Sequence, residues 1–223
     1  SYGDARMPDH ATAGSAPAKT EAARRILLAA RILFAQRGYE GVSIRDVAER
    51  AKASKANVFH HFVNKLGLYR AVLDDSSTGF HQVRNELRDS DSPIHDRLET
   101  FARNNLRTML DDPHSVDLFL RLMMGNTDNT QRTMAEETVL KGLRGLIDSF
   151  EAMRRDGCLA RDTDPTVLAL TILGTNFMFF RLRGLMDQLC EHHSGSNPDA
   201  FSHSLVELLY PTATSADDST ITR

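Results

Sequence analysis

Polar and basic side chains between residues 52 and 65 are suited to contact the bases and phosphates of nucleic acid. A lysine can donate to the acceptors of guanine and an asparagine can pair with adenine, so Lys55 and Asn57 are the expected base readers. Lys65 falls where a further helix is expected to begin, and its cation would join the free N–H groups of that helix end as a phosphate clamp. The residue types and their spacing therefore predict the reading of double-stranded DNA.

Two short helices separated by a tight turn are expected to position these side chains. The first runs from Ser43 to about Arg50, the turn from Ala51 to Ala53, and the second helix starts at Ser54. Each of the two serines is a good N-cap, since its hydroxyl can accept a free backbone N–H of the first turn. Such a pair is a helix-turn-helix, whose second helix can enter a DNA major groove.

The spacing of apolar residues gives each of these helices an inner and an outer face. The residues predicted to point inward are Ile44, Val47 and Ala48 on the first helix and Val58, Phe59 and Phe62 on the second. The residues left for the outer face of the second helix are Lys55, Asn57, His60 and His61. This polar, cationic face is either a DNA-reading surface or an ordinary solvated one.

Charge is divided unevenly along the chain. Hydrophobic residues make up 41% of the 223 residues and charged residues 26%, as in an ordinary globular protein. The net charge of −3 argues against a uniformly basic nucleic-acid binder. Residues 19–65, however, hold ten Lys and Arg against four Asp and Glu, whereas residues 66–223 hold sixteen against twenty-four. A basic amino-terminal module on an acidic body is the electrostatic pattern of a local DNA-binding head.

The remaining composition predicts a cytoplasmic protein. Cys158 and Cys190 are too few for a disulfide framework, which favours a reducing compartment. No cationic segment followed by an apolar run opens the chain, so we expect no secretory signal, and Met7 is a candidate native start. The apolar window over 167–180 is shorter than the roughly 20 residues that span a bilayer. We therefore predict a buried helix there and no membrane contact.

Helical periodicity extends through most of the chain, and no segment alternates as a strand does. Helices are predicted at 20–37, 43–50, from 54 onward, and at 65–88, 93–111, 113–125, 130–156, 164–190 and 197–210. Asn64, Asp112, Asp164 and Asn197 are the predicted caps of the later helices. The expected fold is all-α with about nine helices. Its predicted parts are a disordered segment over 1–18, the helix-turn-helix domain over 19–65, a helical body over 66–210 and a disordered tail over 211–223.

Residues 20 to about 73 resemble the TetR-type (tetracycline-repressor-like) transcriptional regulators. The resemblance rests on the helix over 20–37 that ends with Phe34 and Gly38, then on GYEGVSIRDVAERA, SKANVFHHF, and NK with LY three residues on. It implies a homodimeric repressor whose two heads read a palindromic operator and whose body, residues 66–210, binds a small molecule. Two-fold pairing is physically reasonable, because one short recognition helix contacts too few bases for useful specificity.

Three residues depart from the pattern of this family. Lys52 stands where the turn commonly has Gly, so its φ angle is expected to be positive. A positive φ is uncommon for residues other than glycine. Ala56 replaces a Gly of the recognition helix and is expected to hold the backbone further from a phosphate. Phe59 replaces a Tyr, which removes a phosphate-binding hydroxyl and leaves an apolar anchor. The DNA contacts that the resemblance implies at residues 56 and 59 are therefore the ones expected to differ most from those of the family.

Together, the residue chemistry and the resemblance define a set of predicted DNA contacts. These are Ser43, Arg45, Lys52, Ser54, Lys55, Ala56, Asn57, Phe59, His60, His61 and Lys65. Helix capping is the alternative explanation for the two serines. Solubility of an exposed helix face is the alternative for the charged residues and for the histidine pair.

Polar residues inside apolar stretches of the body favour a ligand cavity. These residues are Asn104, Asn105, Arg121, Thr175 and Asn176. A buried amide must find a partner, which is either a ligand or a neighbouring helix, and the sequence leaves both open. The predicted pocket residues are Phe101, Asn105, Met109, Phe119, Met123, Phe150, Asn176, Phe177 and Phe180. A purely structural core is the alternative for the aromatic and methionine side chains.

The helices at 164–190 and 197–210 are predicted to form the homodimer. The first is apolar on nearly every side, so either the core or a second subunit must cover it. Cys190, His192 and His193, with His203 beyond, are possible zinc ligands, but adjacent histidines suit one ion poorly and no second paired motif follows. We therefore predict no metal and no cofactor.

A ligand-responsive repressor is the leading hypothesis for the function. No phosphate-binding Gly loop, no recognisable Ser/His/Asp arrangement and no HExxH motif occurs, so no catalytic residue is predicted. One alternative is a metal- or redox-sensing regulator with the same DNA-binding head. Another is an all-α ligand-binding protein or enzyme whose helix-turn-helix is vestigial.

Overall fold

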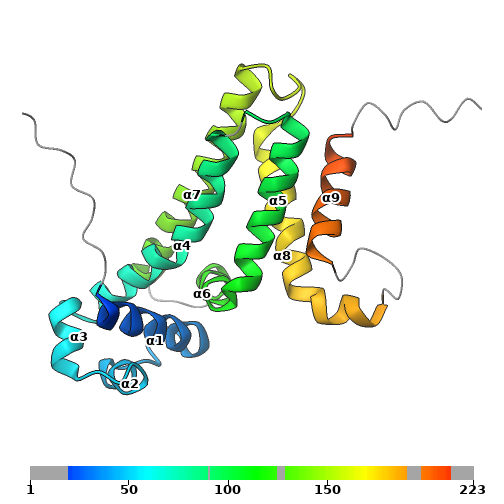
Figure 1. The fold of residues 1–223 in the computed structure, drawn as a ribbon. Coiled ribbons are helices and arrows are strands. Elements are labelled where there is room, and N and C mark those ends of the chain that lie inside the picture. The colour runs from blue at the N-terminus through cyan, green and yellow to red at the C-terminus, as the bar shows by residue number, and fades with distance from the viewer. Residues whose placement is uncertain (1–19, 90, 125–128, 190–196, 212–223) are drawn as a thin grey trace, which may run out of the picture.

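A computed structural model describes residues 20–89, 91–124, 129–189 and 197–211, and within these ranges every regular element is a helix (Figure 1). The helices are α1 (Glu21–Arg37), α2 (Ile44–Arg50), α3 (Lys55–His61), α4 (Lys65–Asp89), α5 (Ile94–Asp111), α6 (Pro113–Met124), α7 (Asn129–Arg155), α8 (Pro165–Leu189) and α9 (Pro198–Leu209). The predicted all-α fold is confirmed, and the predicted ends agree with the structure to within one residue. The predicted disordered segments, apart from Pro211, lie outside the described residues, as do Cys190, His192 and His193.

Side-chain caps explain where many of these helices begin. Ser43 forms a capping box with Asp46, and the Ser54 hydroxyl accepts the backbone N–H of Asn57 at 3.1 Å. The other predicted caps are also confirmed, each side chain accepting N–H groups of the following turn: Asn64, Asp112, Asp164 and Asn197. Gly38 ends α1 with a φ of 72°, a left-handed conformation that favours glycine. Local sequence therefore determines most of the helix boundaries.

Helices α1, α2 and α3 form a head at one end of the molecule (Figure 1). Val47 of α2 and Val58 of α3 are fully buried against α1. The same apolar core continues into the body, where it includes Leu118 and Leu122 of α6. The head is therefore packed firmly onto the body, and the division at residue 65 stays a prediction.

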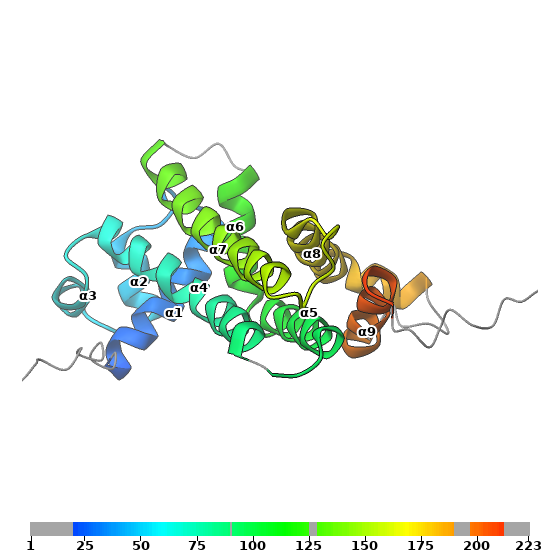
Figure 2. The same ribbon diagram turned by 90° about the horizontal axis from the view of Figure 1, so that it is seen from above.

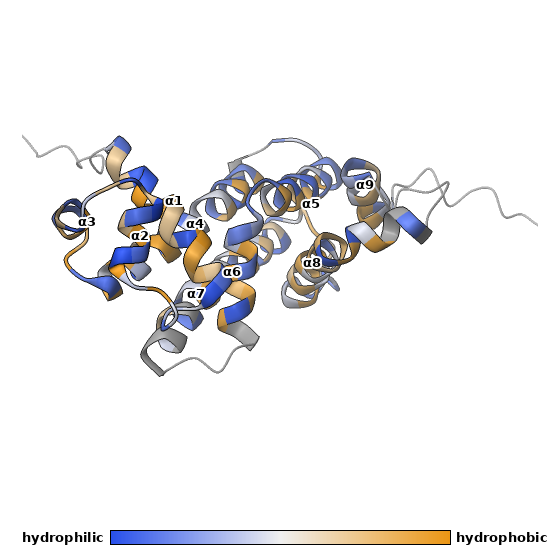
Figure 3. Ribbon diagram, turned by 90° about the horizontal axis from the view of Figure 1, so that it is seen from below, coloured by the Kyte–Doolittle hydropathy of each residue, from blue (hydrophilic) through white to orange (hydrophobic). Residues whose placement is uncertain are grey.

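The body is a bundle in which α4 runs beside α7 and α5 packs on α4, α8 and α9 (Figures 1 and 2). Its main core includes Phe101 of α5 and Phe150 of α7, whose rings meet edge to face at 6.0 Å. Most helices carry both apolar and polar residues around their circumference, as amphipathic helices do (Figure 3). Helix α6 lies between the head and the bundle and packs on α1 and α7.

Helix α8 differs from its prediction in two respects. Its apolar stretch covers 21 residues, Pro165–Leu185, and by length and composition could cross a membrane, so the argument from insufficient length is wrong. Core helices of soluble proteins meet the same criterion, and α8 packs on α5 and α7. Only 39% of an 18-residue window in this stretch is buried, so the prediction of a buried helix holds for one face alone.

Candidate DNA interface and ligand cavity

The predicted recognition helix, α3, lies at the outer edge of the head (Figure 1). Lys55, Ala56 and His60 are exposed on it, and Lys52 is exposed in the preceding turn. Asn57 and His61 are half-buried, which differs from the predicted fully outer position. The exposed part of this surface, together with Arg45 of α2, carries three cationic side chains that could reach phosphates.

Phe59 lies on the outer surface, so its predicted inward orientation is wrong. Val58 and Phe62, four residues apart, share the inner face of α3, and Phe59 is turned about 100° away from Val58. Its side chain is 49% exposed, and Val63 just beyond the helix is 86% exposed. The outer face of α3 therefore presents one large apolar side chain, that of Phe59.

Lys52 has a φ of 51°, which confirms the left-handed backbone predicted for the turn. Its N–H donates to the carbonyl of Glu49, and the N–H of Ala53 donates to that of Ala48 at 2.9 Å. These bonds close the turn between α2 and α3 although no glycine is present. The turn therefore keeps its geometry at the cost of placing a lysine in a conformation that L-residues seldom adopt.

Lys65 is held at the beginning of α4 by an aromatic cluster. Its Nζ atom lies 4.1 Å from the centre of the Tyr39 ring, a cation–π contact. Tyr39 in turn packs edge to face on Tyr69 at 5.0 Å and stacks on Phe34. The lysine is thus fixed beside a helix N-terminus, as the predicted phosphate clamp requires.

The two serines of the DNA-contact prediction have structural roles. Asp46 Oδ2 accepts the Ser43 hydroxyl at 2.7 Å and the Ser43 backbone N–H at 2.8 Å, and these two hydrogen bonds lower the pKa of the Asp46 carboxyl. Ser43 Oγ in turn accepts the Asp46 N–H. The Ser54 hydroxyl caps α3. Both side chains remain exposed, so capping leaves room for a further contact with phosphate.

Two arginines connect the head to α6. Arg31 of α1 pairs with Asp112 and lies 3.3 Å from Ser115 Oγ, both at the start of α6. Arg121 near the other end of α6 donates to the carbonyls of Ala35 and Gln36 at 3.0 and 2.9 Å. Arg121 was expected to mark a pocket, but it satisfies the free carbonyls at the end of α1 instead.

A cavity of about 460 Å³ lies inside the body between α4, α5, α6, α7 and α8. Its wall is mostly apolar, and the volume falls within the range of small-molecule sites. Five of the nine predicted pocket residues line it: Phe101, Asn105, Met109, Phe119 and Phe177. Sequence reasoning missed its contributions from α4 and α7, among them Ser77, Phe80, His81, Arg84, Thr138 and Gly142.

Three predicted pocket residues lie in the core beside the cavity. Phe150 is fully buried against Phe101, and Phe180 is buried under the guanidinium of Arg183. Asn176 is fully buried and donates to the Ala102 carbonyl at 2.8 Å and to Asn105 Oδ1 at 2.9 Å. The side chain of Met123 lies outside the described part of the structure. For Asn176, the partner that the sequence left open is therefore the neighbouring helix α5.

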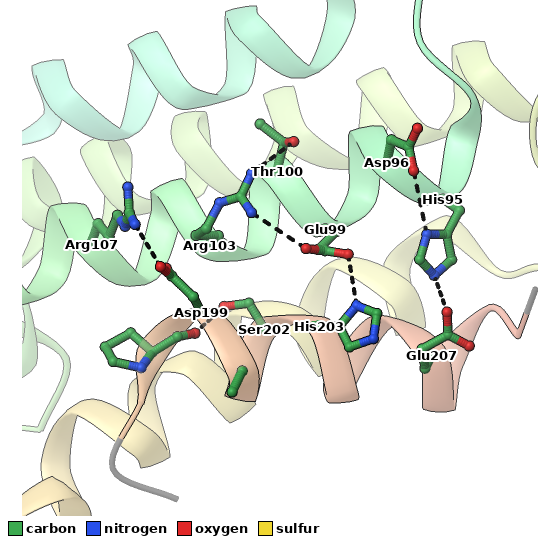
Figure 4. A network of polar contacts seen from close by, with 12 residues as sticks. His95, Asp96, Glu99, Thr100, Arg103, Arg107, Asp199, Ser202, His203 and Glu207 are labelled. Atoms are coloured by element: carbon green, nitrogen blue, oxygen red, sulfur yellow. Dashed lines mark hydrogen bonds and ion pairs between the residues drawn. The ribbon is translucent and has the colours of Figure 1, made fainter. Parts of the chain in front are cut away.

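Helix α9 is attached to α5 by a row of polar contacts (Figure 4). His203 Nδ1 lies 2.9 Å from Glu99 Oε2, and His95 Nε2 lies 2.9 Å from Glu207 Oε1. The hydrogen bond to Glu99 raises the pKa of His203 above its ordinary value. Within the described ranges, no group of three or more His, Cys, Asp and Glu side chains could hold a metal ion.

The outer face of α8 carries large apolar side chains without cover in the single chain. These exposed residues are Val167, Leu170, Met178 and Leu185, of which Leu170 also lines the cavity. They recur at helical spacing and so form one stripe. A stripe of this length on an already well-packed molecule indicates a surface that associates with another molecule.

Comparison with known proteins defines the class to which this arrangement belongs. Residues 26–72 match the family of bacterial regulatory proteins named tetR. The HTH-type transcriptional repressor Rv3405c of Mycobacterium tuberculosis is 39% identical over 93 residues, which cover 42% of this chain and 49% of that protein. The chain thus spans about half the length of the curated relatives that it matches.

Solved structures extend the similarity to the whole fold. The structure of AibR in complex with isovaleryl coenzyme A and operator DNA has a TM-score of 0.60 at 25% identity, over 86% of this chain and 99% of that one. FadR of Bacillus subtilis in complex with stearoyl-CoA has a TM-score of 0.61 at 18% identity, over 85% and 98%. The chain therefore has the fold of helix-turn-helix transcriptional regulators with a helical body. Its head, over residues 26–72, is similar to the tetR family of bacterial regulatory proteins.

Proposed function

We propose that this chain is a dimeric, ligand-responsive repressor that binds a palindromic operator and releases it when a small molecule occupies the cavity. One observation carries the proposal: α6 faces the cavity and the head at the same time. Val116, Phe119 and Leu120 line the cavity, while Arg121 of the same helix holds the end of α1. The tetR-family match of the head and the repressor named among its relatives support the same function.

The contacts of α6 supply a route from the cavity to the DNA. A ligand stabilises whichever arrangement of α4 to α8 makes room for it, and so shifts the population toward that arrangement. Any displacement of α6 acts on α1 at two places, through Arg31 and through Arg121. In a dimer such a displacement changes the separation of the two heads, which must match two half-sites of the operator.

The exposed surface of α3 and its turn is the proposed DNA-reading surface. Lys55 and His60 are placed to contact base edges, and Lys52, Arg45 and Lys65 to contact phosphates. Asn57 contributes from a half-buried position. Phe59 supplies an apolar contact, for which the methyl group of thymine is the natural partner in the major groove.

The apolar stripe on α8 is the proposed dimer surface. It joins two copies of this chain through Val167, Leu170, Met178 and Leu185, which would otherwise stay in water. Helix α9 packs mainly on α5 and exposes Leu208 to solvent. If α9 also contributes to the dimer, as predicted, it does so through the face that carries Leu208. A dimer built in this way leaves both heads free at the opposite end of the molecule.

The apolar cavity wall supports a hydrophobic effector. AibR, which has the same fold, is named as a complex with isovaleryl coenzyme A and operator DNA, so an acyl compound is one ligand that this architecture accepts. No observation on the described residues favours a metal- or redox-sensing mechanism or a catalytic one. Binding to chromosomal DNA would place the protein in the cytoplasm.

The test is DNA binding by the purified full chain. Selection from random duplexes, followed by gel shift, should yield a palindromic site whose affinity falls as salt increases, because cationic contacts release counterions. Addition of an effector found by thermal shift should release that site; a ligand at 100 times its dissociation constant adds about 2.7 kcal/mol of stability. Binding without any sequence preference would contradict the proposed function.

A further inference from the structure

Most polar groups in the wall of the cavity already have partners. The hydroxyls of Ser77 and Thr138 donate to the backbone carbonyls of Asp74 and Met134 at 2.8 and 3.0 Å. The side-chain oxygen of Asn105 accepts from Asn176. The groups that remain for a ligand are the N–H donors of the Asn105 amide, the imidazole of His81 and the guanidinium of Arg84.

Arg84 differs from comparable arginines of the described chain. Arg31, Arg97, Arg103 and Arg154 are, like Arg84, not fully exposed, and each of those four forms a hydrogen bond or ion pair. Arg84 has neither a carboxylate nor a carbonyl partner among the described residues. A half-buried cation without a counter-charge is costly, because the charge loses hydration and gains nothing in return.

Gly145 provides the space in which the Arg84 guanidinium lies. A Cβ atom built at Gly145 would approach Arg84 Nη1 to 2.2 Å and Cζ to 3.0 Å. Glycine inside a helix costs up to about 1 kcal/mol relative to alanine. The absence of a side chain on this turn of α7 therefore admits the guanidinium to the edge of the cavity at some cost in helix stability.

The surroundings of His81, which lines the same cavity as Arg84, are positive. Burial and the charges of Arg84 and Lys141 lower the pKa of His81 below its ordinary value, whereas the Asp74 carboxylate opposes that shift. Arg84 and Lys141 each lower this pKa more than Asp74 raises it, so the potential at His81 is positive and favours the neutral imidazole. An anionic group entering here meets a favourable potential, a guanidinium without a partner among the described residues and, elsewhere in the same wall, the N–H donors of Asn105.

We propose that the cavity takes an amphipathic carboxylate, with the apolar chain against the α5, α6 and α8 walls and the carboxylate paired with Arg84. This ligand class deepens the proposed function and rests on it. The planar guanidinium can donate to both carboxylate oxygens at once. A neutral oxygen group, such as an alcohol, forms a weaker hydrogen bond with it because it carries no charge. Asn105 Nδ2, on α5, is the second donor in the cavity wall.

The experiment compares ligands that differ only in the head group. Straight-chain carboxylates from hexanoate to tetradecanoate, each paired with its primary alcohol and its coenzyme A thioester, are titrated into the full chain by calorimetry and thermal shift. We expect at least one carboxylate to bind roughly tenfold or more tightly than its alcohol, as for a hydrogen bond to a charged group. The same carboxylate should release operator DNA.

Three variants locate that preference. Arg84→Gln should lose roughly tenfold or more in carboxylate affinity and leave alcohol binding unchanged. Gly145→Ala should have a similar effect by displacing the guanidinium, while the protein becomes no less stable. Arg88→Gln, one turn further along α4 and exposed, is the matched control and should change nothing.

Equal affinity for every carboxylate and its alcohol would overturn the proposal, as would a carboxylate preference that survives Arg84→Gln. Binding of the thioesters alone, insensitive to Arg84→Gln, would also overturn it. DNA binding by the ligand-free preparations is measured in parallel. If the unmodified chain binds DNA but shows no carboxylate preference, this inference is refuted and the proposed function still stands.

Discussion

At the scale of single residues, Phe59 is the side chain whose role changes most between sequence and structure. It is exposed on α3, next to the fully buried Val58. Phe59→Ala should therefore alter the free energy of unfolding by less than about 0.5 kcal/mol. It should lower operator affinity roughly tenfold and relax the preference for thymine at one position, because an apolar base contact is lost. Chemical denaturation and site selection measure the two effects.

The matched control for Phe59 is its neighbour. Val58→Ala removes buried methyl groups and should cost about 2 kcal/mol of stability. An equal stability loss for the two variants would place Phe59 in the core after all. Normal operator affinity in Phe59→Ala would remove it from the DNA-reading surface.

Lys52 combines an unfavourable backbone with a predicted phosphate contact. With φ at 51°, Lys52→Gly should raise the free energy of unfolding by about 0.5–1 kcal/mol, because glycine adopts this conformation without a steric penalty. The same change should weaken DNA binding and reduce the slope of affinity against salt by about one unit.

Lys52→Ala separates the two effects, since it removes the charge and keeps the strain. We expect its salt slope to match that of Lys52→Gly, with stability close to that of the unmodified chain. If both variants show an unchanged salt slope, Lys52 does not contact a phosphate.

At the scale of elements, α6 is the connection between the cavity and the head. Arg121→Gln removes the donors to the carbonyls of Ala35 and Gln36 and should cost about 1 kcal/mol. Operator affinity without effector should change little, but the effector should release DNA less completely, because α1 no longer follows α6.

The control for Arg121 is another arginine paired near α6. Arg181 of α8 contacts Asp117 of α6 at 3.2 Å, and both side chains are largely in solvent. Arg181→Gln should therefore change stability by about 1 kcal/mol or less and leave the effector response intact. Full release of DNA by Arg121→Gln would show that coupling takes another route, such as α4.

The attachment of α9 to α5 should depend on pH through His203. Glu99 raises the pKa of His203 in the folded state, so the stabilisation is fully present below the unfolded value near 6.5 and is lost as pH rises through the folded value. At about pH 6 the unmodified chain should have a higher free energy of unfolding than the His203→Gln variant. The difference should be about a few tenths of a kcal/mol, because the pair is exposed, and it should vanish at about pH 8.

Glu99→Gln tests whether the carboxylate causes that dependence. In this background His203→Gln should have the same effect at both pH values, because the partner that favours the charged imidazole is gone. A pH-dependent difference that persists would assign the effect to another neighbour, of which Glu207 is the nearest candidate.

At the scale of the whole molecule, dimerisation is required for the proposed reading of a palindrome. Met178→Glu places a charge in the middle of the apolar α8 stripe and should convert the dimer to monomer, with a loss of operator affinity of at least roughly tenfold. Light scattering after gel filtration measures the assembly. Leu140→Glu, on the exposed face of α7, is the control and should stay dimeric.

The sequence by itself determined the helices and the kind of head. Caps such as Ser43, Ser54 and Asp164, the stop at Gly38 and the spacing of apolar residues are local signals, and each acts within one or two turns. The charge difference between residues 19–65 and the rest was likewise readable from the chain. The positive φ of Lys52 followed from the resemblance, because Lys52 stands where the turn of that family commonly has Gly.

Tertiary structure alone decided which side chains face each other across the body. The space that Gly145 leaves for Arg84 joins residues on α4 and α7, and the hydrogen bond of Asn176 to Asn105 joins α8 to α5. Helical periodicity shows that a residue lies on an apolar or polar face, but it does not show which helix covers that face. For this reason the same pattern placed Phe59 in the core and overlooked the contribution of α4 to the cavity, where the structure places Arg84.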